Sequence, residues 1–422
     1  MEREFQNLSL ANGIRLHHYY THRFKTVLFK FFLQRPLDEQ AGLTALLPFV
    51  LRRGCARYPT SQALAQRLEE LYGAYFDADV SKIGERQLIQ FTLELPREDL
   101  VHEPGLVRQG LEILGQIITA PLQEGEAFRE DYFQQEKNIL LRKIDGLIND
   151  KPRYALQRLF EEMCPQEPFG ISRYGDRQRV QGLTNGELYA HYRELLAGPA
   201  DLFVVGPVPT AELQAAVEKI FPKGWQPAEF PPVTEGQAKG IEVVEEQDVR
   251  QGIIAMGLRT DVTYGHPGYP ALAFYNGILG GFPHSKMFIE VRERASLAYF
   301  AYSRLEATKG LVVASAGIDV EKYQQAREII QAQIDAMAAG QISDEEISAT
   351  RRGLIHRQLV MEDSGHSLID HRLRGLINDR PWGNRELIEA FEKVDKDQII
   401  QVAQNVKLDV TYFLRNYRGE GK

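Results

Sequence analysis

The order of predicted strands and helices repeats once along the chain, on either side of a segment rich in proline and glycine. That segment, residues 221–240, holds four prolines and three glycines, a composition typical of a linker. A duplicated set of elements can fold only into two similar halves, each with its own core. We therefore predict an N-terminal half over residues 1–222, a linker over 223–240 and a C-terminal half over 241–422.

Each half has strands followed by a helix, a second helix, a strand hairpin, two long helices and a closing strand. Apolar residues alternate in the strands and recur every three or four residues in the helices. The tripeptide Ala-Tyr-Phe even recurs at the same point, at 74–76 and 298–300. We expect an α+β fold of two homologous sandwich halves with antiparallel strands and helices on one sheet face, facing each other as a clamshell.

Composition narrows the classes of partner and the compartment. The net charge is −8, which is unfavourable for a nucleic-acid partner because phosphate binding needs a basic face. No apolar run approaches the roughly 20 residues that span a bilayer, and no signal peptide is visible, so no membrane association is expected. Two cysteines, Cys55 and Cys164, cannot form a disulfide framework or a thiolate metal cluster, and we expect both to be packing residues. These features predict a cytoplasmic protein.

Conventional catalytic motifs are missing from the sequence. It contains no phosphate loop, no dinucleotide fingerprint, no Gly-x-Ser-x-Gly elbow, no His-Glu-x-x-His and no His-x-x-Glu-His. His17 and His18 are adjacent on a predicted strand and point to opposite faces, and His366 and His371 are five residues apart, which is wrong for one helix face. All ten histidines are therefore interpreted as surface or capping residues.

Residues 42–54, GLTALLPFVLRRG, form a predicted apolar helix with a proline at its centre. Pro48 lacks a backbone donor and crowds the preceding turn, which costs about 3 kcal/mol in a helix interior. The residues themselves give no reason for this position.

Residues 285–303, SKMFIEVRERASLAYFAYS, form a predicted helix followed by a strand. Arg292 and Tyr299, seven residues apart, can reach one edge and offer guanidinium donors beside a phenol. Together they are suited to hold a peptide carbonyl or an oxyanion. On residue types alone, a solvated arginine and a core tyrosine are the favoured interpretation.

The two-half arrangement and these two segments together resemble the insulinase/pitrilysin-like zinc peptidases, which include the mitochondrial processing peptidase. The resemblance covers essentially the whole chain. It is strongest to the YmfF-like subgroup, whose members are described as non-catalytic partners of a zinc-binding subunit.

The resemblance implies a degenerate zinc site in the first half. Active members carry His-x-x-Glu-His on the opening helix, and the two histidines and the glutamate correspond to Ala45, Phe49 and Pro48 here. The third zinc ligand, a glutamate seven residues after another acidic residue, corresponds to Lys143, while Glu136 keeps the acidic residue. Lys143 could supply a positive charge in place of the metal. No zinc or other cofactor is expected on this chain.

The second half, by the same resemblance, keeps substrate-binding residues. Arg292 and Tyr299 match the pair that binds the substrate backbone and stabilises the oxyanion of the facing zinc site. Gly280 and Gly281 resemble a glycine-rich loop near the substrate chamber. We therefore expect a zinc-less subunit that completes a peptide chamber for a homologous subunit carrying the zinc.

Two alternatives remain. One is a catalytically silent scaffold or peptide-binding protein, and the other is a part of a protein-modification system. The isolated chain could also form homodimers, and a self-contained peptidase is the least favoured function.

Overall fold

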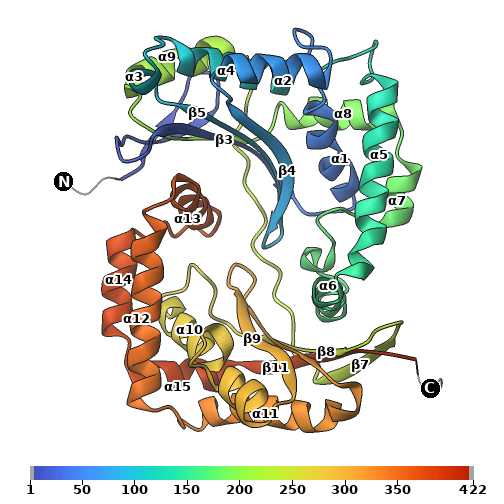
Figure 1. The fold of residues 1–422 in the computed structure, drawn as a ribbon, viewed down its shortest axis with the longest axis vertical. Helices are drawn as coiled ribbons and strands as arrows, with labels where there is room; N and C mark the ends of the chain where they lie inside the picture. The colour runs from blue at the N-terminus through green and yellow to red at the C-terminus, as the bar shows by residue number, and fades with distance from the viewer. Residues whose placement is uncertain (1–3, 418–422) are drawn as a thin grey trace. The chain divides into compact units, whose positions relative to one another are not determined.

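Two compact units, each built around one β-sheet, make up the protein in the computed structural model, which describes residues 4–417. The first unit holds the chain up to Asp145 together with Ile171–Pro232. The second holds Gly146–Gly170 and the chain from Val233 onward. In both units helices pack against a sheet, which confirms the predicted α+β class (Figure 1).

The two sheets have the same strand order. Among the described residues, six strands form the first sheet in the order β1-β2-β6-β3-β5-β4, and five form the second in the order β7-β11-β8-β10-β9. Apart from the extra strand β1, each strand of one sheet has its counterpart in the other, as a duplicated fold requires. The first-sheet strands are β1 (Gln6–Ser9), β2 (Arg15–Tyr19), β3 (Thr26–Pro36), β4 (Tyr75–Ile83), β5 (Arg86–Pro96) and β6 (Ala200–Val205). Those of the second are β7 (Ile241–Glu246), β8 (Gly252–Arg259), β9 (Ala298–Glu306), β10 (Leu311–Ile318) and β11 (Lys407–Arg415).

The expectation of purely antiparallel pairing is wrong at one position in each sheet. The closing strand β6 pairs with β2 in parallel, and its counterpart β11 pairs with β7 in parallel. Parallel neighbours need a long crossover connection, and each of these pairs is joined by the whole series of helices of its own half. Alternating apolar residues predict a strand but do not fix its direction.

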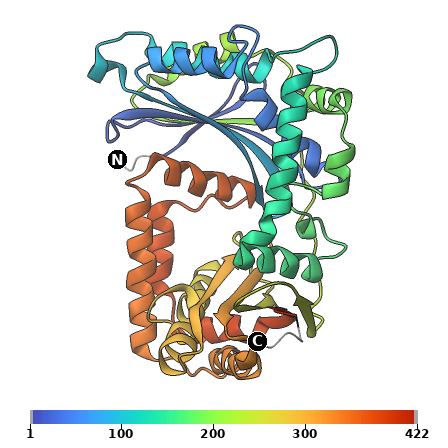
Figure 2. The same cartoon turned by 45° about the vertical axis from the view of Figure 1, so that its right-hand side comes forward.

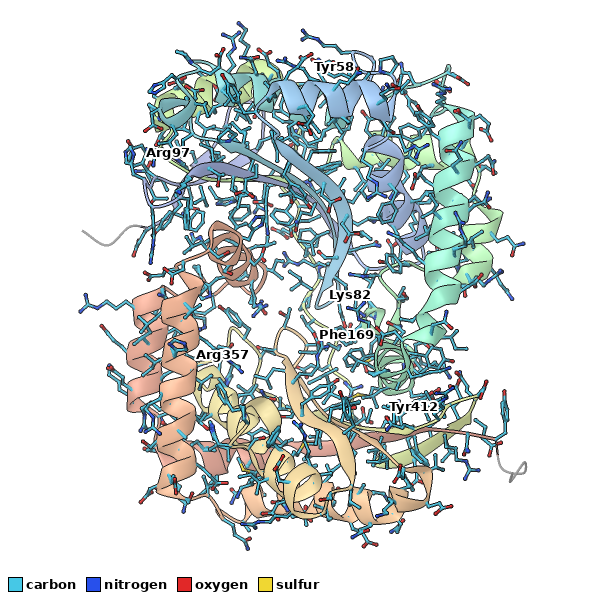
Figure 3. All side chains as sticks on the ribbon, viewed as in Figure 1. Tyr58, Lys82, Arg97, Phe169, Arg357 and Tyr412 are labelled. Carbon is cyan, nitrogen blue, oxygen red and sulfur yellow. The ribbon has the colours of Figure 1, made fainter. Side chains whose placement is uncertain are left out.

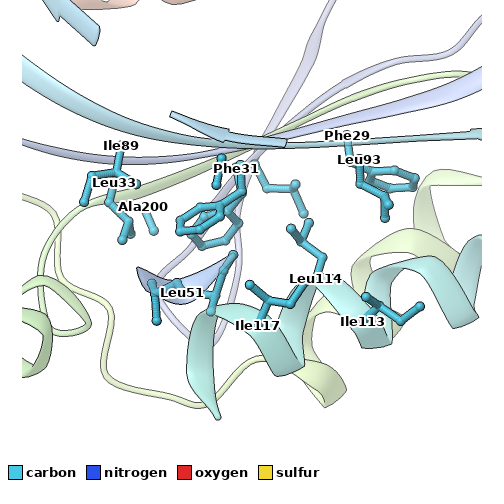
Figure 4. Packing of buried hydrophobic residues seen from close by; sticks show 14 of the residues in the cluster. Phe29, Phe31, Leu33, Leu51, Ile89, Leu93, Ile113, Leu114, Ile117 and Ala200 are labelled. Carbon is cyan, nitrogen blue, oxygen red and sulfur yellow. The ribbon is translucent and has the colours of Figure 1, made fainter. Parts of the chain in front are cut away.

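The core of the first unit lies between the sheet and one layer of helices. Phe29, Phe31 and Leu33 alternate along β3 and point to the same side, where they meet Leu114 and Ile117 (Figure 4). The helices of this unit are α1 (Ala41–Leu51), α2 (Ser61–Glu70), α3 (Glu98–Val101), α4 (Leu106–Thr119), α5 (Glu130–Asp145), α7 (Arg177–Gly182), α8 (Asn185–Leu195) and α9 (Thr210–Ile220).

The second unit has two apolar layers, one on each face of its sheet. The larger core lies under α10, α11 and α15. On the opposite face α6 runs across β8 and β11 (Figure 2). The helical segments are η1 (Gly146–Asn149), α6 (Lys151–Met163), η2 (Pro168–Gly170), α10 (Tyr269–Asn276), η3 (Gly277–Gly281), η4 (Phe288–Arg294), η5 (Val320–Lys322), α11 (Tyr323–Ala338), α12 (Asp344–Met361), α13 (Gly365–Ile377), α14 (Asn384–Lys393) and α15 (Lys396–Asn405).

Helix α6 precedes the linker in sequence but belongs to the unit that follows it. Leu159 and Met163 of α6, with Phe169 just after it, form one apolar cluster with Tyr412 and Val410 of β11 (Figure 3). The antiparallel hairpins and the two long helices of each half lie where the repeat predicts them, whereas α7, α8, α9, α13, α14 and α15 were not predicted. The segment Gly146–Gly170, which the prediction placed in the N-terminal half, belongs to the second unit. No helix within residues 4–417 combines the length and apolar character needed to span a bilayer.

A buried ionic cluster fastens this segment and the linker to the second sheet. The Arg259 guanidinium donates to Asp409 Oδ2 at 2.7 Å and to Glu167 Oε1 at 2.7 Å. Lys309 pairs with the other oxygen of Glu167 at 2.6 Å and donates to the Thr234 carbonyl. Burial acts to raise the pKa of Glu167, but the hydrogen bonds from Arg259 and Lys309 outweigh it and hold the pKa below its ordinary value.

The two cysteines are buried and carry free thiols. Cys55 packs in the core of the first unit and Cys164 in the α6 cluster of the second. Burial raises the pKa of both thiols, that of Cys164 to about 11, so neither is an activated nucleophile. The predicted packing role of both residues is confirmed.

Candidate functional site: a degenerate metal site and an exposed arginine–tyrosine pair

Helix α1 carries the three positions that the family resemblance assigns to metal chemistry. It runs without a break through Pro48, and the next turn is intact because the Arg52 amide donates to the Pro48 carbonyl at 3.1 Å. Ala45 and Phe49 are 0% and 1% exposed and lie in the apolar core. None of the three side chains has an atom that can bind a metal or accept a proton.

The fourth position, Lys143 on α5, lies over the ring of Phe49. Its Nζ is 3.9 Å from the ring centroid, and the Arg52 guanidinium carbon lies 4.9 Å from the same centroid. Both distances fall within the range of cation–π attraction. The family's metal locus therefore holds a buried aromatic ring with two cations beside it.

Glu136 is the acidic residue that this sequence shares with the family motif. It is buried and pairs with Arg53. Arg53 Nη1 approaches Glu136 Oε1 at 3.5 Å, and Arg53 also donates to Gln135 Oε1 at 2.6 Å. Burial raises the pKa of Glu136, against the opposing charges of Arg52, Arg53 and Lys143. Glu136 thus acts as a counter-charge to Arg53.

These donors do not fit a zinc ion. Zinc needs imidazole, thiolate or carboxylate ligands in tetrahedral geometry, and here an apolar pair, a proline and a cation stand at the ligand positions. Within residues 4–417 no group of three or more His, Cys, Asp or Glu side chains is arranged to hold a metal ion.

We expect the purified chain, incubated with zinc and then passed through a desalting column, to retain only substoichiometric metal. The ammonium of Lys143 and the ring of Phe49 leave no lone pair for the ion. Elemental analysis by mass spectrometry measures the ratio, with a His-x-x-Glu-His homologue treated in parallel as the positive control. Tightly bound zinc at one equivalent per chain would contradict this assignment.

Arg292 and Tyr299 lie on consecutive elements of the second unit. Arg292 is in η4, which contacts the edge strand β9, and Tyr299 is the second residue of β9. Tyr299 is 79% exposed, which excludes its interpretation as a core residue. The Arg292 guanidinium lies 4.6 Å from the Phe288 ring centroid and has only a loose contact, 4.0 Å, with Glu293. Both polar heads are therefore available to a ligand.

Gly280 and Gly281 end the π-helical segment η3. A Cβ on Gly280 would stand 2.2 Å from the backbone nitrogen of Ser303, so only glycine allows η3 to pack this closely against β9. A Cβ on Gly281 would stand 2.9 Å from Asn276 Nδ2 and 3.0 Å from the Asn276 carbonyl oxygen. Close packing therefore explains both glycines without a ligand.

Three histidines are not surface or capping residues, so that interpretation is wrong for them. His17, His18 and His191 are 4%, 0% and 3% exposed. His17 hydrogen-bonds Asp201 at 2.8 Å, and His18 contacts Thr210 Oγ1 at 3.0 Å. Both faces of β2 are buried, which the alternation of one strand does not reveal.

His191 ties α8 to α1 and is neutral in the folded protein. Arg35 Nη1 donates to its Nδ1 at 3.1 Å, so we assign the ring proton to Nε2, which donates to Thr44 Oγ1 at 2.8 Å. Burial and the nearby charge of Arg35 lower the pKa of His191 to about 4, against the weaker opposing charge of Asp38.

His191 is expected to make folding stability depend on pH. Its pKa is lower folded than unfolded, so its contribution is complete above about pH 6.5 and is lost as the pH falls toward 4. The loss amounts to about 3 kcal/mol. Urea unfolding at pH 7 and pH 4 measures it against His191→Gln, which cannot titrate. An equal pH dependence of the two proteins would refute a buried neutral His191.

Comparison with known proteins identifies the family to which the chain belongs. A family model described as "Peptidase M16 inactive domain" matches residues 182–354. A protein of Bacillus subtilis (strain 168) is 37% identical over 427 residues, which cover 97% of this chain and 98% of that protein. The chain belongs to the M16 peptidase family, among the homologues described as inactive, and the resemblance drawn from the sequence is confirmed. The Bacillus subtilis relative is the "Probable inactive metalloprotease YmfF".

Two further proteins are similar over different lengths. A conserved protein from Enterococcus faecalis V583, known from a crystal structure, superposes with a TM-score of 0.91 at 27% identity and covers 99% of this chain and 100% of its own. The antilisterial bacteriocin subtilosin biosynthesis protein AlbE of Bacillus subtilis (strain 168) is 22% identical over 276 residues, 64% of this chain and 68% of AlbE. The Enterococcus faecalis structure matches 99% of this chain, so the similarity extends over both units.

Proposed function

We propose that the chain is the non-catalytic subunit of a two-chain zinc peptidase. Its partner carries His-x-x-Glu-His and the zinc, and this chain contributes one half of the peptide-binding chamber. The observation that carries the proposal is the exposure of Tyr299 at 79%, on the strand that follows the segment carrying Arg292, in a chain whose own α1 has no metal ligands. A fork of guanidinium donors and a phenol hydroxyl can hold a substrate carbonyl and stabilise the oxyanion formed at a partner's metal.

Peptide binding is supported by the sheet edges. Strands β4 and β9 are terminal in the strand orders of their sheets, so each has one edge without a neighbouring strand among the described residues. Such an edge binds an extended peptide through backbone hydrogen bonds. Tyr299 begins one of these edges, and η3 with Gly280 and Gly281 supports the same strand.

The test is to co-express the chain with a zinc-motif homologue encoded by the same organism. The peptidase activity of each chain alone and of the pair is then measured on a quenched fluorescent peptide. We expect activity only from the pair, or a large gain over the homologue alone, together with co-elution of both chains. A homologue that is fully active by itself and does not bind this chain would overturn the proposal.

A second candidate is a scaffold or peptide-binding protein that works without a catalytic partner in a protein-modification system. Similarity to AlbE, a protein named for bacteriocin biosynthesis, favours this alternative. Purification without any zinc-bearing partner, as a monomer or homodimer that still binds peptides, would distinguish it. The cytoplasmic location expected from the two cysteines stays a prediction.

A further inference from the structure

Lys143 holds a positive charge that no described residue neutralises by contact. Its ammonium makes a cation–π contact with Phe49 but no hydrogen bond or ion pair within residues 4–417. Arg52, beside the same ring, has one loose partner, Asp77, at 3.7 Å. The ring holds the Lys143 ammonium in place and leaves its N–H donors available for a ligand.

The charges around Lys143 add to an excess of cations. Glu136 pairs with Arg53 at 3.5 Å, so these two charges offset each other. Arg173 lies near enough to Lys143 for its charge to act on the ammonium. It donates a hydrogen bond to the Tyr174 hydroxyl and not to a carboxylate. This leaves Lys143, Arg52 and Arg173 against two carboxylates, Asp77 and Asp79. One negative charge from outside the chain would complete the balance.

The cations lie beside the open edge of β4. Ala78 and Val80 of β4 face the core that contains α1, so Asp77 and Asp79, which alternate with them, extend to the opposite face. Arg52, at the end of α1, reaches Asp77 and therefore passes the edge of the strand. A peptide added to β4 would run directly past this group.

We propose that Lys143 and Arg52 bind a carboxylate of an extended peptide that pairs with the open edge of β4. This inference rests on the proposed peptide-binding function and names the chemistry of the ligand. The ammonium and guanidinium donate hydrogen bonds to the carboxylate oxygens, and the ring of Phe49 keeps one side of the contact free of water. The carboxylate comes from an acidic side chain or from the peptide's C-terminus.

A decapeptide library tests the proposal. The sixth position is Glu or Gln, the other nine are randomised without cysteine, aspartate or glutamate, and each pool is made with a free and with an amidated C-terminus. Peptides retained by the immobilised full-length chain are quantified by mass spectrometry. Lys143→Met removes the charge and Lys143→Arg keeps it. Arg142→Met is the matched control, because Arg142 is exposed, adjacent on α5 and makes no hydrogen bond or ion pair with any described residue.

We expect the wild-type chain and the Arg142→Met and Lys143→Arg variants to prefer a carboxylate about tenfold. Lys143→Met should lose the preference while its melting temperature stays that of the wild type. Preference for Glu in amidated pools assigns a side chain, and preference for free C-termini assigns the chain end. Equal retention of all four pools, Glu and Gln with free and with amidated C-termini, overturns this inference alone. Retention of no peptide by any variant overturns both it and the proposed peptide binding.

Discussion

Replacing Arg259 with methionine is expected to lower the free energy of unfolding of the second unit by about 3–5 kcal/mol, because it leaves buried charges without a partner. Asp409 is 0% exposed and receives the Arg259 Nε–H, while the Met163 carbonyl accepts from Nη2 at 2.6 Å. Glu167 would keep only Lys309. Scanning calorimetry should show a fall of about 10 °C in the melting temperature of this unit.

The matched control is Arg385→Met. Arg385 also pairs with a carboxylate, Glu389, at 3.0 Å, but both side chains are largely exposed. Its loss should cost under about 0.5 kcal/mol, as for other surface ion pairs. If both variants melted at the same temperature, the Arg259 cluster would not hold Gly146–Gly170 and the linker on the second sheet.

The fold was largely predictable because its elements have strong periodicity and occur twice. The alternating residues of β4 and β9, and the helical spacing of α4 and α11, specify element type without any knowledge of neighbours. Strand direction in the β2–β6 and β7–β11 pairs could not be predicted, because it depends on contacts across some 160 to 190 residues of chain. The unit to which α6 belongs could not be predicted either, because the apolar face of a helix does not indicate which sheet it covers.

The contacts at the candidate site could not be predicted from the sequence. The resemblance assigns Ala45, Pro48, Phe49 and Lys143 to the metal positions, and residue chemistry then shows that none of them can bind zinc. That the Lys143 ammonium lies over the Phe49 ring depends on the packing of α5 against α1. The buried histidines were missed for the same reason, since their partners Asp201 and Thr44 are far away in sequence.

In the complex with a zinc-bearing partner, Tyr299→Phe is expected to reduce turnover by about 10²- to 10³-fold, the usual cost of removing one donor from an oxyanion site. Phenylalanine keeps the ring and removes only the hydroxyl, and the side chain is 79% exposed, so neither folding nor assembly should change. Arg292→Ala should have an effect of similar size. Steady-state kinetics measures turnover, and native mass spectrometry confirms that the two chains remain associated.

Tyr302→Phe supplies the control for this prediction. Tyr302 lies on the same strand, beyond the register shift at Tyr299, and its ring contacts that of Phe300 with the centroids 5.7 Å apart. Removing the Tyr302 hydroxyl should leave turnover unchanged, whereas removing the Tyr299 hydroxyl should lower it. If turnover of the pair were unchanged by both Tyr299→Phe and Arg292→Ala, the exposed pair would serve no catalytic step. A catalytically silent scaffold would then be the better explanation of this chain, in which the position assigned to the metal holds the Phe49 ring beneath Lys143.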